Sequence, residues 1–265
     1  MSTADAGESL RQRAQQECGA IADALASSSH PHEAIHAARK AIRRLRALLA
    51  LLDHTALEVR QVDRQLQRLG DGLSRIRDAH VVLEAARLLQ RGDAAVPWDA
   101  VIEALAQRRQ RLLLQLLQDD PGFARRLRVV AAVRERLDAQ PWQQVRGKQV
   151  RLNLERSVRR ADKAAARARQ QDDAEAVHRW RRRVRRLRMQ RDIVHDLGLH
   201  GLRGRAHDAA RPSCRALHRL SDALGWQQDL RLLRNLVRAM PASAGKPRVM
   251  QQIDAVAETA MNRAS

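Results

Sequence analysis

Two segments of the chain carry the same spacing of basic residues, and their apolar residues predict that both are helices. One runs from His36 to Arg46 and the other from His178 to Arg188, at an offset of 142 residues. Both read His-x-x-Arg-[Lys/Arg]-x-[Ile/Val]-Arg-Arg-Leu-Arg. A guanidinium group donates hydrogen bonds in a planar fork that matches two phosphate oxygens. Because the His, aliphatic and Leu positions are shared as well, the pattern indicates a duplicated element suited to binding phosphate groups.

The polar positions of these two helices are the candidate phosphate ligands. They are His36, Arg39, Lys40, Arg43, Arg44, Arg46, His178, Arg181, Arg182, Arg185, Arg186 and Arg188. The stretches 39–46 and 179–188 contain no acid, whereas an ordinary solvated helix face mixes both signs at four-residue spacing. Like charges on one face cost stability, so we expect an anion from outside the chain to offset them.

The two histidines allow two interpretations that the sequence does not separate. Each imidazole can donate a hydrogen bond to a phosphate oxygen, or it can bond a carboxylate such as Asp78 or Asp229. These two acids follow the basic motifs at corresponding places, and we expect them to orient Arg or His side chains rather than to act as catalytic acids.

A further basic cluster follows Pro141. It comprises Arg156, Arg159, Arg160 and Lys163. Its surroundings are rich in Ala, so the cluster either extends a phosphate track or forms a plain surface face.

The elements that position these residues are predicted to be helices throughout. Apolar residues recur at three-and-four spacing, they are mostly Leu, Ala and Val, and aromatic residues make up only 2% of the chain. We therefore predict an all-α protein with helices near 8–25, 32–52, 56–90 (bent near Gly70 and Gly72), 98–118, 122–139, 142–170, 173–197, 205–238 (broken near Gly225) and after Pro247. Pro141 is the predicted boundary between a first half, 1–140, and a second half, 141–265, of one domain.

The formal net charge of +20 on 265 residues indicates an anionic partner. Cys18 and Cys214 are isolated, no stretch has the roughly 18 apolar residues of a membrane span, and the first residues lack the pattern of a secretory leader. We expect a cytoplasmic protein that has no membrane contact, no cofactor and no metal site.

Two other functions compete with phosphate binding. His32-Glu33-x-x-His36 matches a zinc hydrolase motif, but the second copy has Ala174 and Glu175 at the first two positions, so only His36 is shared. Nonspecific nucleic-acid binding is the stronger alternative, because an Arg-lined groove attracts any phosphate backbone. With five aromatic residues in the chain, however, a platform for stacking bases is not expected.

With both motifs and the following segments Leu69-Gly70, Arg77–Leu83 and Leu224–Leu230, the chain resembles the conserved histidine α-helical domain (CHAD) family over nearly its whole length. The resemblance implies two helical bundles related by an approximate two-fold axis, with basic residues around a central cavity that binds inorganic polyphosphate. It also implies association with polyphosphate granules. We therefore expect a polyphosphate-binding protein that is not an enzyme.

Overall fold

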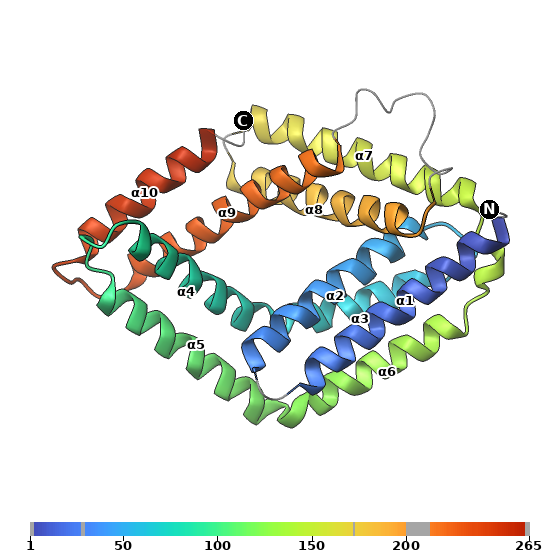
Figure 1. The fold of residues 1–265 in the computed structure, drawn as a ribbon, viewed down its shortest axis with the longest axis horizontal. Coiled ribbons are helices and arrows are strands. Elements are labelled where there is room, and N and C mark those ends of the chain that lie inside the picture. The colour runs from blue at the N-terminus through green and yellow to red at the C-terminus, as the bar shows by residue number, and fades with distance from the viewer. Residues whose placement is uncertain (1–2, 28–29, 172, 200–212, 263–265) are drawn as a thin grey trace. The chain divides into compact units, whose positions relative to one another are not determined.

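The computed structural model describes residues 3–27, 30–171, 173–199 and 213–262, and these are almost entirely helical (Figure 1). The helices are α1 (Thr3–Ala26), α2 (Pro31–Leu51), α3 (Val59–Asp71), α4 (Ser74–Gly92), α5 (Asp99–Asp119), α6 (Ala124–Asp138), α7 (Gly147–Gln170), α8 (Ala174–Asp196), α9 (Cys214–Ala239) and α10 (Lys246–Asn262), with short 3-10 turns η1 (Pro121–Phe123) and η2 (Trp142–Gln144). No strand occurs among the described residues. The predicted all-α class is confirmed.

The chain divides into two compact units that do not follow the predicted boundary at Pro141. Unit 1 comprises 1–72 and 122–221, and unit 2 comprises 73–121 and 222–265. Each unit thus takes segments from both sides of Pro141, and α9 runs from unit 1 into unit 2. The interpretation of 1–140 and 141–265 as two copies of one ancestral segment stays a prediction.

Two predicted helices differ from the observed ones. The stretch predicted as one bent helix over 56–90 is two helices, because α3 ends at Asp71 and α4 begins at Ser74, just past the two glycines. The predicted break near Gly225 is wrong, since α9 continues through it. Buried Leu224 and Leu230 on either side hold the helix by packing, which outweighs the weak helix propensity of one glycine. Residues 205–212 of that prediction lie outside the described residues.

Unit 1 is built around two helical hairpins, α1 with α2 and α7 with α8. In its core α1 packs on α2, α6 and η2, while α2 also packs on α3, α7 and α8. Leu10 and Ile21 of α1 and Leu45 and Leu48 of α2 are completely buried. The three-and-four apolar spacing seen in the sequence therefore places these helices around one core.

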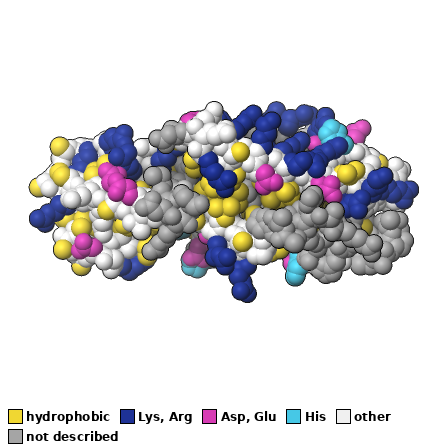
Figure 2. Space-filling model, turned by 90° about the horizontal axis from the view of Figure 1, so that it is seen from above, with side chains coloured by type: hydrophobic (Ala, Val, Ile, Leu, Met, Phe, Trp, Pro, Cys, Tyr) yellow, Lys and Arg dark blue, Asp and Glu magenta, His cyan; other side chains and the backbone are white. Residues whose placement is uncertain are grey.

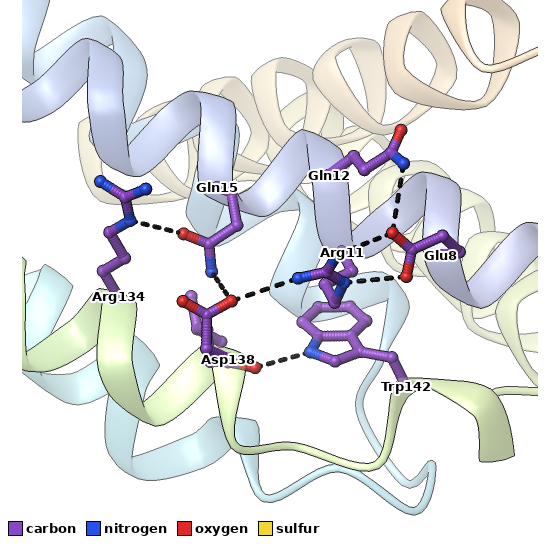
Figure 3. A network of polar contacts seen from close by, with 8 residues as sticks. Glu8, Arg11, Gln12, Gln15, Arg134, Asp138 and Trp142 are labelled. Atoms are coloured by element: carbon purple, nitrogen blue, oxygen red, sulfur yellow. Dashed lines mark hydrogen bonds and ion pairs between the residues drawn. The ribbon is translucent and has the colours of Figure 1, made fainter.

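A polar network fixes α1 against α6 on the surface of unit 1 (Figure 3). Arg11 bonds Glu8 at 2.8 Å and reaches Asp138 at 3.4 Å, while Gln15 donates to Asp138 at 2.9 Å. The indole of Trp142 donates to the carbonyl oxygen of Leu137 at 2.6 Å, which ties η2 to the end of α6. These contacts hold α1 in place, so that its other side can present charges to α2.

Gly7 marks a close approach of helices in the same region. A Cβ atom added to Gly7 would lie 2.2 Å from the carbonyl oxygen of Trp142. Any larger residue at this position would push α1 away from η2.

Unit 2 has a core of its own, formed by α4, α5, the second part of α9 and α10. Trp98 is fully buried there, and its indole donates to Gln252 at 2.6 Å.

No described helix is both long and apolar enough to cross a lipid bilayer.

Candidate anion-binding site

The two helices that carry the basic motif, α2 and α8, pack against each other within unit 1. At their contact the fully buried Gln190 of α8 donates to the carbonyl oxygen of Ala47 in α2 at 3.2 Å. Asp173 caps the start of α8 by accepting from the backbone N–H groups of Glu175 and Ala176, and Pro31 opens α2. Both copies of the motif therefore lie in one compact unit.

Each motif helix presents its basic residues on two neighbouring stripes rather than on one face. At about 100° per residue, the two sets lie on separate lines along the helix. The histidine stripe contains His36, Arg39, Arg43 and Arg46 in α2 and His178, Arg181, Arg185 and Arg188 in α8. The hairpin stripe contains Lys40 and Arg44 in α2 and Arg179, Arg182, Arg183 and Arg186 in α8. The neighbours of these side chains show that the stripes face different helices.

The histidine stripe of α2 faces α3. Arg39 is half-buried and donates through Nη1 to the carbonyl oxygen of Gly70. Arg46 binds the carboxylate of Asp63 with two hydrogen bonds, Nε to Oδ1 at 2.7 Å and Nη2 to Oδ2 at 3.0 Å. His36, at the start of the stripe, is exposed. The stripe is thus held in place by its neighbours, and at Arg46 its charge is already matched.

The histidine stripe of α8 is more buried. Arg181 is only 5% exposed, and His178, Arg185 and Arg188 are half-buried. Arg188 Nη1 lies 3.5 Å from Nδ1 of His218 in α9, whose Nε2 lies 3.1 Å from Asp192. This contact orients the last arginine of the stripe.

In the hairpin stripe of α2, Arg44 is neutralised by α1. Glu17, only 3% exposed, contacts Nε of Arg44 at 2.8 Å and Nη2 of Arg44 at 2.7 Å, and it also accepts from Arg13 at 3.0 Å. The expectation that the motif arginines have no counter-charge within the chain is therefore wrong for Arg44 and Arg46. Sequence reasoning looked for acids on the same helix, whereas these acids come from α1 and α3.

The hairpin stripe of α8, in contrast, lines a groove of about 500 Å³ between α7 and α8. Seven basic side chains line the groove, three from α7 and four from α8. They are Arg160, Lys163, Arg167, Arg179, Arg182, Arg183 and Arg186, and Glu175 is the one acid in the lining. Figure 2 shows Lys and Arg side chains over much of one face, most closely spaced at its upper right, with acidic side chains beside some of them.

Two arginines in this groove have a guanidinium pKa below the usual value. For Arg186 the largest cause is burial, followed by Arg46, Arg183 and Arg182, with Asp63 acting in the opposite direction. For Arg183 the causes are burial and then Arg160 and Arg182. Burial is the largest cause of both shifts, and the neighbouring arginines add to it.

A second hollow of about 330 Å³ shares Arg160 and Arg186 with the groove. The other side chains that line this hollow come from the end of α2, from α3 and from the segment between them, and they include Asp63 and Arg64. The basic groove therefore opens toward a mixed-charge region instead of ending at Arg186.

The remaining predicted residues lie elsewhere. Asp78 and Asp229 belong to unit 2, where Asp78 accepts from Arg77 at 2.7 Å and Asp229 is half-buried. Their role in orienting the motif histidines stays a prediction. Of the zinc motif, His32 is half-buried while Glu33 is exposed, and the described residues contain no group of three or more potential metal ligands.

Sequence reasoning missed Arg167, Arg179 and Arg183 as parts of a site. The signal was present, because Arg160, Lys163 and Arg167 repeat at helical spacing on α7, as the hairpin stripe does on α8. What the sequence lacked was the pairing of these two helices.

An all-helical chain in which two basic motif helices lie in one unit is a candidate for binding a polyanion. The CHAD domain pattern matches residues 6–238, and the chain belongs to the CHAD domain family. No curated protein matches it.

Two solved structures are similar to this chain. The CHAD domain from the plant Ricinus communis has a TM-score of 0.63 and 21% identity, with 99% of this chain and 86% of that one covered. PptA from Streptomyces chartreusis has a TM-score of 0.66 and 18% identity, with 97% and 98% covered. At such identities the likeness concerns the fold alone.

Proposed function

We propose that this protein binds inorganic polyphosphate without catalysing a reaction on it, through the histidine stripes of α2 and α8. The observation that carries the proposal is the packing of both motif helices within unit 1. The net charge of +20 and the membership in the CHAD family support it. The resemblance of the two motifs to this family implies that the ligand is polyphosphate.

The stripes suit a linear polyanion for a physical reason. Their arginines are half-buried or, at Arg181, buried, and several are fixed by neighbours, such as Arg39 by the carbonyl oxygen of Gly70 and Arg188 by His218. A fixed guanidinium loses little conformational freedom when it binds a phosphate oxygen. Forks at repeated spacing along a helix can then bind successive phosphates of one chain.

The structure narrows the set of proposed ligands. Arg44 and Arg46 are bound to buried or half-buried carboxylates, so we assign them to the support of the fold. The residues that we propose as polyphosphate ligands are His36, Arg39, Arg43, His178, Arg181, Arg185 and Arg188 of the histidine stripes, together with Lys40 of the hairpin stripe of α2. Arg182 and Arg186 belong to the groove with α7.

The test reverses the charge at the corresponding positions Arg43 and Arg185. Arg43→Glu with Arg185→Glu should abolish binding of long polyphosphate at physiological salt, because repulsion replaces two hydrogen-bonded ion pairs. The matched control is Arg128→Glu with Arg231→Glu, which changes the net charge equally at two exposed positions. Circular dichroism checks that helicity is kept, and Arg43→Gln with Arg185→Gln is the milder pair if the first does not fold.

Competition between polyphosphate and single-stranded DNA of matched charge separates the two candidate partners. Preference for polyphosphate supports the proposal, and equal competition would identify a generic polyanion binder. Release of orthophosphate from polyphosphate by the purified protein would contradict the noncatalytic role. A fluorescently tagged protein that stays diffuse in cells containing polyphosphate granules would contradict a role at granules.

A further inference from the structure

The groove between α7 and α8 lies on a different side of α8 from the histidine stripe. Arg182 and Arg183 of the groove lie in sequence between Arg181 and Arg185 of the histidine stripe. At about 100° per residue, however, they lie on a separate line along the helix. The groove also has a second wall, α7, which contributes Arg160, Lys163 and Arg167. It is therefore a separate place at which an anion can bind.

Most cations of the groove have no ion pair within the described part of the chain, although Asp63 acts electrostatically on Arg186. Six of them have no ion pair or hydrogen bond with another described residue: Arg160, Lys163, Arg167, Arg182, Arg183 and Arg186. Arg179 alone is paired, with Asp173 at 3.6 Å and Glu175 at 3.4 Å. Since Glu175 is the one acid in the lining and is engaged by Arg179, most of the positive charge remains uncompensated.

Several features distinguish this groove from an ordinary basic surface. Two walls bring seven cations together around a hollow of about 500 Å³, and because all of them except Arg186 are exposed, water and salt screen part of their repulsion. Arg186 is half-buried and its pKa is lowered, first by burial and then by neighbouring arginines. The acidic end at Glu175 limits the site on one side, while Arg160 and Arg186 continue into the next hollow.

We infer that this groove is a second binding site, which takes a short run of consecutive phosphoryl groups. Phosphoryl oxygens match the arginine forks, and a short run of phosphoryl groups brings several negative charges to the unpaired cations. The lining contains no aromatic side chain, so a nucleobase has no stacking partner in it. The ligand is therefore an oligophosphate, either free or as a segment of a longer chain, and not the base of a nucleotide.

The experiment titrates the full chain with tripolyphosphate by calorimetry at physiological salt. The groove variant is Lys163→Glu with Arg183→Glu, two exposed positions on opposite walls. It should bind tripolyphosphate at least about tenfold more weakly, since losing about 1.4 kcal/mol of binding free energy has this effect. ATP should bind wild type no more tightly than tripolyphosphate does.

Two comparison variants complete the design. Arg128→Glu with Arg231→Glu has the same change in net charge, and Arg43→Glu with Arg185→Glu removes the proposed polyphosphate ligands. The first should bind tripolyphosphate much as wild type does, and the second should keep the part of tripolyphosphate binding that comes from the groove. If the groove variant binds tripolyphosphate as the Arg128 and Arg231 variant does, or if citrate competes as well as tripolyphosphate, the inference is overturned.

The same variants distinguish free oligophosphate from a segment of a long chain, and the groove from the histidine stripes. Binding of long polyphosphate that is weakened in the groove variant identifies the groove as part of the path of a long chain. Long-chain binding that is unchanged, with tripolyphosphate binding lost, identifies a site for free oligophosphate. Loss of long-chain binding in the Arg43 and Arg185 variant tests the proposed function alone. If Lys163→Glu with Arg183→Glu lowers the melting temperature strongly, Lys163→Gln with Arg183→Gln serves in its place.

Discussion

The two helical hairpins of unit 1, α1 with α2 and α7 with α8, treat an equivalent arginine in opposite ways. Arg44 and Arg186 occupy the same position of the repeated motif. Arg44 meets the carboxylate of Glu17 on α1, whereas Arg186 lines a groove with Arg160 of α7. Glu17 precedes Arg44 by 27 residues and Arg160 precedes Arg186 by 26, and the second connection between helices is one residue shorter than the first.

The buried faces of α1 and α7 support this correspondence. Gly7, Leu10 and Cys18 are buried on α1, and 143 residues later Val150, Asn153 and Ala161 are buried on α7. In the same register Arg13 corresponds to Arg156 and Glu17 to Arg160. Where the first hairpin has Arg, Glu and Arg, the second has three arginines.

The difference indicates where each hairpin obtains its counter-charge. In the first, Glu17 bridges Arg13 and Arg44, so the basic residues are satisfied within the fold. In the second, the acid is replaced by another cation, and the fold tolerates the repulsion without removing it. An arrangement of this kind is stabilised by an anion that binds the folded state.

The largest effect is expected when the internal counter-charge is removed from the first hairpin. Glu17→Gln should lower the free energy of unfolding by about 3 kcal/mol, because removing one partner from a buried ion pair leaves the other charge uncompensated. Urea unfolding followed by circular dichroism measures this change. Glu103→Gln, at an exposed position of α5, is the matched control and should have little effect. Equal stability of both variants would show that Glu17 is not essential to the first hairpin.

A smaller effect of opposite sign is expected when the acid is introduced into the second hairpin. Arg160→Glu should pair with Arg186 and with Arg156 four residues before it, and raise the free energy of unfolding without ligand by about 1 kcal/mol. It should also abolish tripolyphosphate binding in the groove. Arg128→Glu, with the same charge change on α6, separates the local pairing from the reduced net charge. A variant that is destabilised or still binds tripolyphosphate would break the comparison of the hairpins.

The sequence predicted the helices more completely than the arrangement of charges around them. Apolar spacing located every helix that the structure describes, because burial of one face determines a helix from local residues alone. The merged prediction over 56–90 failed at Gly70 and Gly72, where backbone freedom allows either a bend or an end.

The site was less predictable because charge compensation is a tertiary property. The acid that neutralises Arg44 lies 27 residues away on another helix, and the acid that binds Arg46 lies 17 residues away. No rule of helical spacing connects these residues. Similarly, Arg183 was not singled out from the sequence, although it lines the same groove as Lys163 of α7.

The smallest effect concerns Cys18, which lies beside Glu17 and corresponds to Ala161 of the second hairpin. Burial raises the pKa of the Cys18 thiol to about 12 from its ordinary value of 9.0, and Asp138 and Glu17 raise it further, against the effect of Arg134. The folded state thus keeps a proton that the unfolded state releases between pH 9 and 12, so this thiol contributes stability that falls as pH rises through that window. Cys18→Ala should cost less than about 1 kcal/mol at pH 7, where the thiol is protonated in both states. It should make the decline in stability above pH 9 less steep, as measured by urea unfolding across pH.

With a thiol reagent at pH 8, Cys18 of the folded protein should stay unmodified, and in Glu17→Gln it should react faster because the first hairpin opens more often. Rapid modification of Cys18 in the native protein would show that the first hairpin is not closed by the pairing of Glu17 with Arg13 and Arg44.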